Sequence, residues 1–233
     1  MKAWSVLGLL GIGLLASAPG RALDAVNLVE DWTEHAVGSS GVPAGWDKYE
    51  TFGGRPRYDF TVVSEDGVRG LRVRSRDDHS TIAREVSVDL AATPVLEWTW
   101  KVARLPEGAD IRRKDTSDLG VQLIVVWPRP PAWLRSRLIA YGWDERLAGG
   151  TIEPSRKTRT VTFVIVRSGT ADLDRWVTER RNVADDYRKI FGEAPDNPRA
   201  VAISIDTNDT HSTAEALVGR IAFTGETGRS EPK

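Results

Sequence analysis

Arginine, asparagine and aspartate side chains gather in one short stretch of the chain, residues 174–192 (DRWVTERRNVADDYRKIFG). Within it, Arg181, Asn182 and Asp186 carry groups that can form paired hydrogen bonds to a carboxylate or to sugar hydroxyls. A second interpretation uses the same groups differently, because an arginine that points inward from a strand needs a carboxylate partner. The cluster is therefore either part of a ligand site or a structural ion-pair network under a helix.

Tryptophan is the second residue type that suggests binding. The chain has 9 Trp, 4 Tyr and 5 Phe, so half of its aromatic side chains are indoles. An indole packs its flat face against the C–H face of a sugar ring and keeps an N–H group for hydrogen bonding. Trp46, Trp133, Tyr141 and Trp143 stand in loop contexts, so each is a candidate ligand platform, with packing of the loop as the alternative.

Asp206, Asn208 and Asp209 place three oxygen-bearing side chains on one turn near the C-terminus. Hard cations such as calcium take ligands of this type, so the three residues form a candidate calcium site. An EF-hand loop would have Gly at its sixth position and a bidentate Glu at its twelfth, where this chain has His211 and Leu217. An Asx turn at the end of a strand is the alternative interpretation.

Asp115 and Asp118 precede the apolar segment 119–127. Asp118 is a candidate ligand contact, and the two carboxylates together are a candidate acid pair for glycoside chemistry. Other chemistries lack their sequence signals. The chain has no Cys, its three His are scattered, and it contains no Gly-x-Ser-x-Gly, phosphate-loop or dinucleotide motif. No cofactor is predicted beyond the calcium candidate.

The elements that must position these groups are mostly strands. Residues 95–102 alternate, with Trp98 and Trp100 on the apolar face, and this period of two predicts a half-buried strand. Apolar or β-branched patterns also predict strands at 28–32, 57–63, 70–75, 119–127, 160–166, 176–180, 200–206 and 216–223. Short strands at this spacing, without alternating helices, indicate an all-β antiparallel sandwich.

One short helix interrupts the strands. Asn182 is its predicted N-cap, Asp185 and Asp186 favour the positive end of the helix dipole, and Gly192 ends it. A helix of this length is too short to be stable alone in water, so it must pack on the sheets. A helical turn is also expected within residues 132–139.

Composition favours one domain and no nucleic-acid partner. A chain of 233 residues with 40% hydrophobic and 28% charged side chains suits a single sandwich core, predicted at residues 23–224. The net charge of -1 gives no overall field that would attract nucleic acid or an anionic membrane. Residues 225–233 are expected to form a disordered tail.

The N-terminal residues 1–22 are typical of a secretory signal peptide. Lys2 precedes an apolar run at 6–16, which is shorter than the roughly 20 residues that a membrane-spanning helix needs. Cleavage is expected after Ala22, although the bond itself is not fixed by the pattern, and an uncleaved anchor is the alternative. A periplasmic or secreted protein without a membrane span is therefore predicted.

The order of several motifs resembles a known family. WTWKV, LPEGAD, Asp118 before a long apolar strand, YGW, WVTERRNVADDYRKIFG and DTNDT are similar to the bacterial secreted family known as domain of unknown function 3047. The resemblance implies a jelly-roll (galactose-binding-like) sandwich similar to carbohydrate-binding modules, and it assigns no activity. Leu119 and Gly120 follow Asp118 here, where the resemblance implies small or aromatic residues before an arginine, so a contact through that arginine is not carried over.

The sequence thus predicts a secreted, non-catalytic sandwich that binds a polysaccharide, a glycan or a similar polar extracellular ligand. A polysaccharide-active lyase or hydrolase is the first alternative, and it would need a cleft that holds perturbed acid and base groups. A structural or assembly protein of the cell envelope is the second, and its aromatic residues would be buried or form one flat exposed patch. The predicted ligand contacts are Trp46, Asp118, Tyr141, Trp143, Arg181, Asn182 and Asp186.

Overall fold

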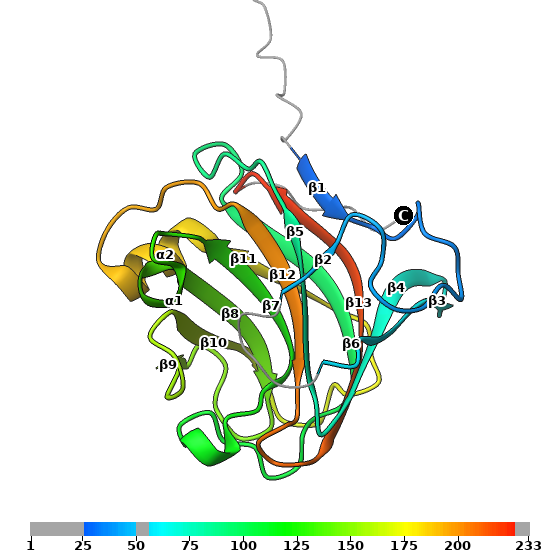
Figure 1. The fold of residues 1–233 in the computed structure, drawn as a ribbon. Helices are drawn as coiled ribbons and strands as arrows, with labels where there is room; N and C mark the ends of the chain where they lie inside the picture. Colours follow the sequence, from blue (N-terminus) through cyan, green and yellow to red (C-terminus); the bar gives the residue numbers. More distant parts are fainter. Residues whose placement is uncertain (1–25, 50–55, 227–233) are drawn as a thin grey trace, which may run out of the picture.

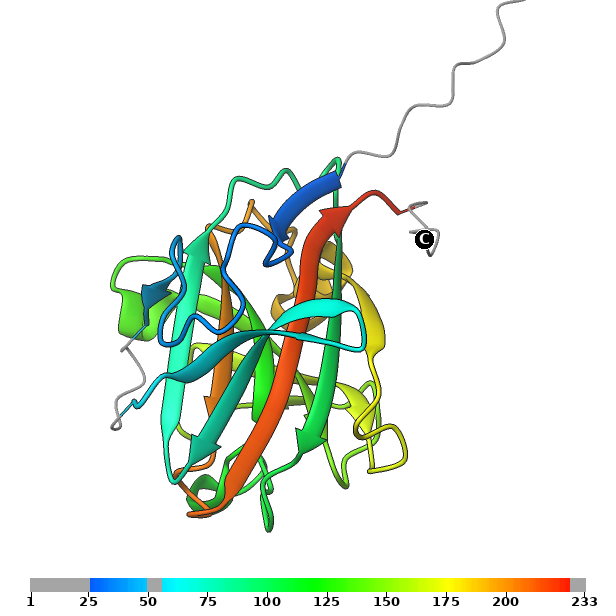
Figure 2. The same ribbon diagram turned by 90° about the vertical axis from the view of Figure 1, so that its right-hand side faces the viewer.

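The protein consists of two sheets stacked face to face (Figure 1). A computed structural model describes residues 26–49 and 56–226. The predicted signal peptide and residues 227–233 of the predicted tail lie outside the described residues. The first sheet has the order β11 (Val177–Asn182), β6 (Val95–Arg104), β13 (Thr213–Thr224), β4 (Val68–Arg76) and β3 (Asp59–Glu65), and β1 (Val26–Glu30) pairs with β13. Figure 2 shows this sheet from its outer side, with β13 running through its middle.

The second sheet contains seven strands. Its order is β2 (Asp47–Lys48), β5 (His79–Glu85), β12 (Ala200–Asp206), β7 (Gly120–Trp127), β8 (Arg137–Asp144), β10 (Val161–Ser168) and β9 (Ile152–Pro154). All neighbouring pairs in both sheets are antiparallel except β8 and β10. The chain changes sheet after β1, β2, β4, β5, β6, β10, β11 and β12, so many neighbours within a sheet are distant in sequence. This arrangement is a jelly-roll β-sandwich, as predicted.

Within residues 26–49 and 56–226, three short helical segments join the strands: η2 (Lys114–Thr116), α1 (Ala132–Arg135) and α2 (Val183–Phe191). The predicted helix is α2, and its end signals are confirmed. The side chain of Asn182 accepts a hydrogen bond of 3.0 Å from the N–H of Asp185, and Gly192 adopts a left-handed conformation after the last turn. None of the helices in the described ranges is long and apolar enough to cross a membrane.

Apolar side chains form two clusters rather than one. The larger cluster fills the space between the sheets, and Trp98 and Trp100 lie fully buried within it, as their alternation predicts. The smaller cluster covers part of the outer face of the second sheet, with Ile124 of β7 and Phe163 of β10 among its members. Strands β7 and β8 are therefore apolar on both faces, because each face is covered.

The predicted strands all exist, but the sequence reasoning missed β2, β5, β8 and β9. The error at β8 was the largest, because a helical turn was expected within residues 132–139 and residues 141–143 were expected to be the end of a strand that enters a loop. Helix α1 has only four residues, and β8 begins two residues later. Gly142, which suggested a loop, is required within the strand because a Cβ atom there would lie 2.2 Å from Cδ2 of Leu119.

Candidate functional site

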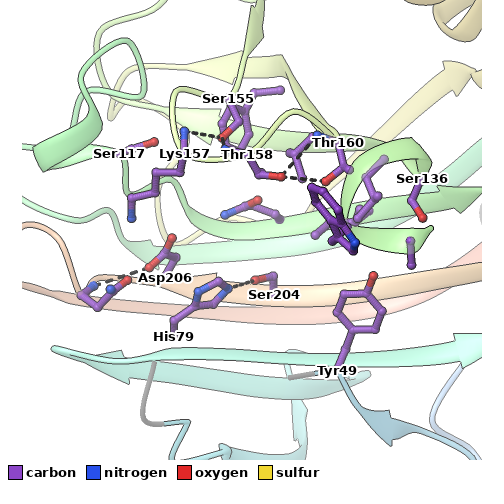
Figure 3. Close-up of a pocket in the computed structure, with 18 residues that line it drawn as sticks. Tyr49, His79, Ser117, Ser136, Ser155, Lys157, Thr158, Thr160, Ser204 and Asp206 are labelled. Carbon is purple, nitrogen blue, oxygen red and sulfur yellow. Dashed lines mark hydrogen bonds between the residues drawn. The ribbon is translucent and has the colours of Figure 1, made fainter. Parts of the chain in front are cut away.

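A pocket of about 280 Å³ opens on the outer face of the second sheet. Strand alternation explains its position. Ile203 and Ile205 of β12 pack between the sheets, so Ser204 and Asp206 point outward into the pocket. Figure 3 shows side chains from β5, β12 and the segment 155–160 converging on one space.

Hydroxyl groups make up much of the pocket wall. Six serine or threonine residues from separate segments of the chain contribute: Ser117, Ser136, Ser155, Thr158, Thr160 and Ser204. The hydroxyls of Thr158 and Thr160 lie 2.8 Å apart and share a hydrogen bond. The buried Oγ of Ser117 has no hydrogen-bond partner within the described part of the chain. Because each hydroxyl can donate and accept, the wall suits a ligand that itself carries hydroxyls.

One edge of the pocket is apolar and aromatic. Trp133 lies on the single-turn helix α1 and is 72% exposed, the most exposed large apolar side chain among the described residues. Leu138, Val161 and Phe163 form the apolar wall beside it, and Tyr49 adds a third aromatic ring to the lining. An indole held this open can offer a flat face to a ligand.

Charged groups occupy the opposite part of the lining. Lys157 forms an ion pair with Asp209, whose side chain is mostly buried. Nε2 of His79 lies 3.3 Å from the hydroxyl of Ser204 and 3.2 Å from that of Thr81. Burial lowers the pKa of His79 to about 4, and the nearby Lys157 charge adds to this effect. The imidazole is therefore neutral near pH 7 and contributes a hydrogen-bonding group rather than a charge.

Asp206 shares its environment with a second carboxylate. Burial raises the pKa of Asp206 well above its ordinary value, and the charge of Asp118 and the hydrogen bond between the two carboxyl groups raise it further. A proton shared by two close carboxyl groups removes the repulsion between them. Asp118 is fully buried, whereas Asp206 reaches the pocket wall.

Two of the three predicted calcium ligands have other partners in the structure. Asp206 is paired with Asp118, and Asp209 is paired with the ammonium group of Lys157, which supplies the positive charge that a cation would bring. Across residues 26–49 and 56–226, no group of three or more His, Cys, Asp or Glu residues is arranged to hold a metal ion. The turn instead has the alternative form, in which the N–H of Asn208 approaches Oδ1 of Asp206 at 3.5 Å.

Arg181, Asp186 and Tyr141 form a buried network away from the pocket. Nε of Arg181 donates to Oδ2 of Asp186 at 2.9 Å, its Nη2 donates to Oδ1, and the Tyr141 hydroxyl donates to Oδ2 at 2.9 Å. Burial raises the pKa of Tyr141 well above its ordinary value, so the phenol stays protonated as a donor. The structural ion-pair interpretation is thus the one that the structure supports.

The other predicted contacts also lie outside the pocket. Trp143 is 1% exposed and donates to the carbonyl of Gly169 at 2.8 Å. Trp46 is buried, stacks on Trp32 at 5.8 Å and donates to Oε2 of Glu30 at 3.0 Å. Asn182 is the α2 cap. The expectation that Tyr141 and Trp143 lie in loops was wrong, because both belong to β8 and point into the core.

Sequence reasoning found Asp206, Asn208 and Trp133 of this pocket and missed most of the rest. Ser117, Lys157 and Ser204 come from segments that the fold brings together across the sheet, and no local motif marks them. A usable signal was present in residues 200–206, where Ser204 and Asp206 alternate with Ile203 and Ile205. Polar residues at the outward positions of an otherwise apolar strand indicate a face that is open to solvent or to a ligand.

The fold and the pocket together define a jelly-roll β-sandwich with a small polar site on the outer face of one sheet. The chain belongs to the family described as "Protein of unknown function (DUF3047)", which matches residues 44–222. This match confirms the resemblance carried by the motifs. A comparison with curated proteins found no match.

Several solved structures are similar to this chain at low identity. A family 11 carbohydrate-binding module of the cellulase Lic26A-Cel5E from Clostridium thermocellum has 11% identity and a TM-score of 0.47, covering 90% of this chain and 100% of its own. A point mutant of the family 29 module CBM29-2 has 13% identity and a TM-score of 0.40, covering 90% and 99%. The xyloglucanase domain of NopAA from Sinorhizobium fredii, in complex with cellobiose, has 11% identity and a TM-score of 0.43, covering 83% and 100%.

Proposed function

We propose that this protein binds a carbohydrate in the pocket on the outer face of the second sheet. The observation that carries the proposal is the combination of the exposed indole of Trp133 with six serine and threonine hydroxyls in one concave site. Apolar C–H faces and many hydroxyls are the two chemical features of a sugar, and the pocket offers a surface for each.

The size of the pocket favours a short piece of a glycan. Small-molecule sites commonly enclose about 300–1,000 Å³, and this pocket, at about 280 Å³, lies at the lower end. A free oligosaccharide, or the end of a longer polysaccharide, fits such a site better than a long internal stretch. Lys157 and Asp206 lie beside the hydroxyls and can bind the polar edge of the ring.

A polysaccharide-cleaving enzyme is the second candidate, and Asp206 is the observation that favours it. Its raised pKa lets this carboxyl group keep its proton to higher pH than an ordinary aspartate, as a general acid must. Hydrolysis also needs a second carboxylate that can reach the substrate or a water molecule. Asp206 is the one acidic side chain that lines the pocket within the described ranges, and Asp118 is fully buried, so we favour binding.

Affinity electrophoresis of the purified protein tests the proposal directly. The protein is run through gels that contain a panel of soluble polysaccharides, with calcium and with EDTA. We expect retardation in at least one gel, unchanged by EDTA because Lys157 already neutralises Asp209. Unchanged mobility across a broad panel, together with no binding of free oligosaccharides in calorimetry, would contradict the proposal and favour the envelope-protein alternative.

Two variants locate the binding. Trp133→Ala should weaken sugar binding by about tenfold or more, because truncating an aromatic anchor commonly costs more than about 1 kcal/mol. Leu134→Ala on the same helix is the matched control, since Leu134 is also exposed but does not line the pocket. Equal losses in both variants would place the effect in α1 rather than in the indole.

The enzyme alternative has its own test, which is incubation of the protein with polysaccharides. Release of reducing sugar by the parent protein, abolished in Asp206→Asn, would show that the protein is a polysaccharide-cleaving enzyme.

The place of action is a separate proposal. We propose that the protein works in the periplasm or outside the cell, on the basis of the apolar run at residues 6–16 after Lys2. Fractionation of cells followed by mass determination of the mature N-terminus tests this idea. A full-length chain in the cytoplasm would contradict it and leave the pocket chemistry unaffected.

A further inference from the structure

A second concave site lies at one end of the first sheet, where β4 and β6 finish and β13 begins. Its volume is about 450 Å³, and four of its lining residues are arginines: Arg57, Arg74, Arg76 and Arg104. Alternation along β4 places Leu71 and Val73 in the core, so the arginines between and beyond them point to the outer face. We name this site the arginine basin.

The acidic side chains of the arginine basin are largely engaged elsewhere. Asp78 is buried, and its carboxylate accepts hydrogen bonds from the N–H of His79 at 2.7 Å, the N–H of Arg57 at 3.1 Å and the hydroxyl of Ser80 at 2.8 Å. These bonds fix the backbone of the basin, and among the described residues Asp78 forms no ion pair with an arginine. Glu215 is shared between Arg72 at 3.4 Å and Arg74 at 3.2 Å.

Three arginines consequently keep their charge available. Within the part of the chain that the structure describes, the side chains of Arg57 and Arg76 form no ion pair, and Arg104 donates only to the hydroxyl of Thr213, at 3.1 Å. Asp59 is the remaining acid of the lining and it is exposed. The basin therefore holds an excess of positive charge in a molecule whose net charge is -1.

We propose that the arginine basin binds a small oxyanion ligand, with a carboxylate or a sulfate group held between Arg57, Arg76 and Arg104. A guanidinium group presents two parallel N–H donors, a geometry that matches the two oxygens of a carboxylate or sulfate. The volume suits a compound of the size of a sugar acid. The net charge of -1 gives no overall field that would attract a long polyanion such as nucleic acid.

The arginine basin is distinct from the carbohydrate pocket and does not depend on it. The two sites have no lining residue in common, although Asp78 lines the basin and its neighbour His79 lines the pocket. The strand turn between β4 and β5 therefore separates them. An acidic glycan could engage both sites, and a simple anion could engage the basin alone.

Calorimetric titration at low ionic strength tests the proposal with three probes. Galacturonic acid carries a carboxylate, glucose 6-sulfate carries a sulfate ester, and galactose is the neutral control. We expect one of the two acidic probes to bind, and its identity decides between the two groups. The Arg57→Gln, Arg76→Gln double variant should bind that probe at least about tenfold more weakly, because it loses hydrogen bonds in which the donor is charged.

Matched variants separate a defined site from diffuse surface charge. The Arg188→Gln, Arg199→Gln double variant removes the same charge from α2 and from the residue before β12, outside the basin, and should bind like the parent protein. Asp59→Asn should strengthen binding, because it removes an acid from the basin. Absence of binding by both acidic probes, or equal weakening in the two double variants, would overturn the proposal. Trp133→Ala should leave this binding intact, so failure of the basin and failure of the pocket are told apart.

Discussion

The carboxylate of Asp118 accepts a hydrogen bond of 2.7 Å from the backbone N–H of Thr210, although 92 residues separate the two in sequence. The Thr210 hydroxyl donates to the same oxygen at 2.6 Å, and the N–H of Asp209 donates to the other at 3.1 Å. One fully buried carboxylate thus holds the turn after β12 against the start of β7. Because Asp206 and Asn208 line the pocket from that turn, this contact fixes part of its wall.

Asp118→Ala should destabilise the fold strongly. The substitution leaves two backbone N–H groups and one hydroxyl without their acceptor, and each unsatisfied buried group costs about 1–3 kcal/mol. We expect the free energy of unfolding to fall by about 3 kcal/mol or more, measured by urea denaturation. Asp115→Ala is the control, since Asp115 is exposed and pairs only with Arg113. A change below about 0.5 kcal/mol, as for ordinary surface substitutions, would refute the assigned role of Asp118.

Asp206 should make stability depend on pH in a defined direction. Its pKa in the folded protein is raised above the ordinary 3.8, so folding favours its protonated form. The stability that this group contributes is complete below pH 3.8 and is lost as pH rises through the raised pKa. Asp206→Asn keeps a neutral side chain at every pH. The unfolding free energy of the parent relative to this variant should therefore decrease from acid to neutral pH, and a pH-independent difference would contradict the shared proton.

His79 should act over a different pH range. Its pKa is lowered from 6.5 to about 4 in the folded protein, so the unfolded chain binds the proton more tightly between these values. Stability relative to His79→Gln should fall as pH drops from 6.5 toward 4, by at most about 3.5 kcal/mol, because each pKa unit corresponds to about 1.4 kcal/mol. Parallel stability curves for the two proteins over this range would show that the imidazole is not held neutral. Direct NMR titration of the ring provides an independent check.

Local sequence signals predicted the elements that depend on local physics. The cap formed by Asn182 and the left-handed Gly192 act within one helix turn, and both are where the sequence placed them. The alternation through Trp98 and Trp100 predicted the buried face of β6, because one face of that strand meets the core and the other does not. Patterns of this kind are read from neighbours in sequence.

The pocket was harder to predict because its walls come from distant parts of the chain. Tyr141 and Trp143 were predicted as candidate platforms, with packing of the loop as the alternative, from their apparent loop context. Strand β8 is covered on both faces, so it lacks the clear alternation that would have marked it as a strand. Trp133 is the exposed indole, and it follows the proline-rich segment 128–131 after β7. Such a segment indicates a loop, but it does not indicate in which direction the side chain points. Tertiary contacts pair Asp206 with Asp118 and Asp209 with Lys157. The sequence does not show these partners, so the oxygen-bearing side chains of one turn suggested a cation site instead.

Asp186 should be a stability residue rather than a ligand contact. It accepts hydrogen bonds from Arg181 and Tyr141, and it is 5% exposed. Removing one partner of a buried ion pair costs about 3–5 kcal/mol, and the partial exposure of Arg181 places Asp186→Ala at the lower end of this range. Urea denaturation measures the loss, and a double-mutant cycle with Tyr141→Phe measures the coupling between the phenol and the carboxylate.

Arg188→Ala, which removes an exposed pair with Asp185, is the control and should change stability by less than about 0.5 kcal/mol. If Asp186→Ala were to abolish sugar binding while stability stayed unchanged, the ligand interpretation of this cluster would be restored.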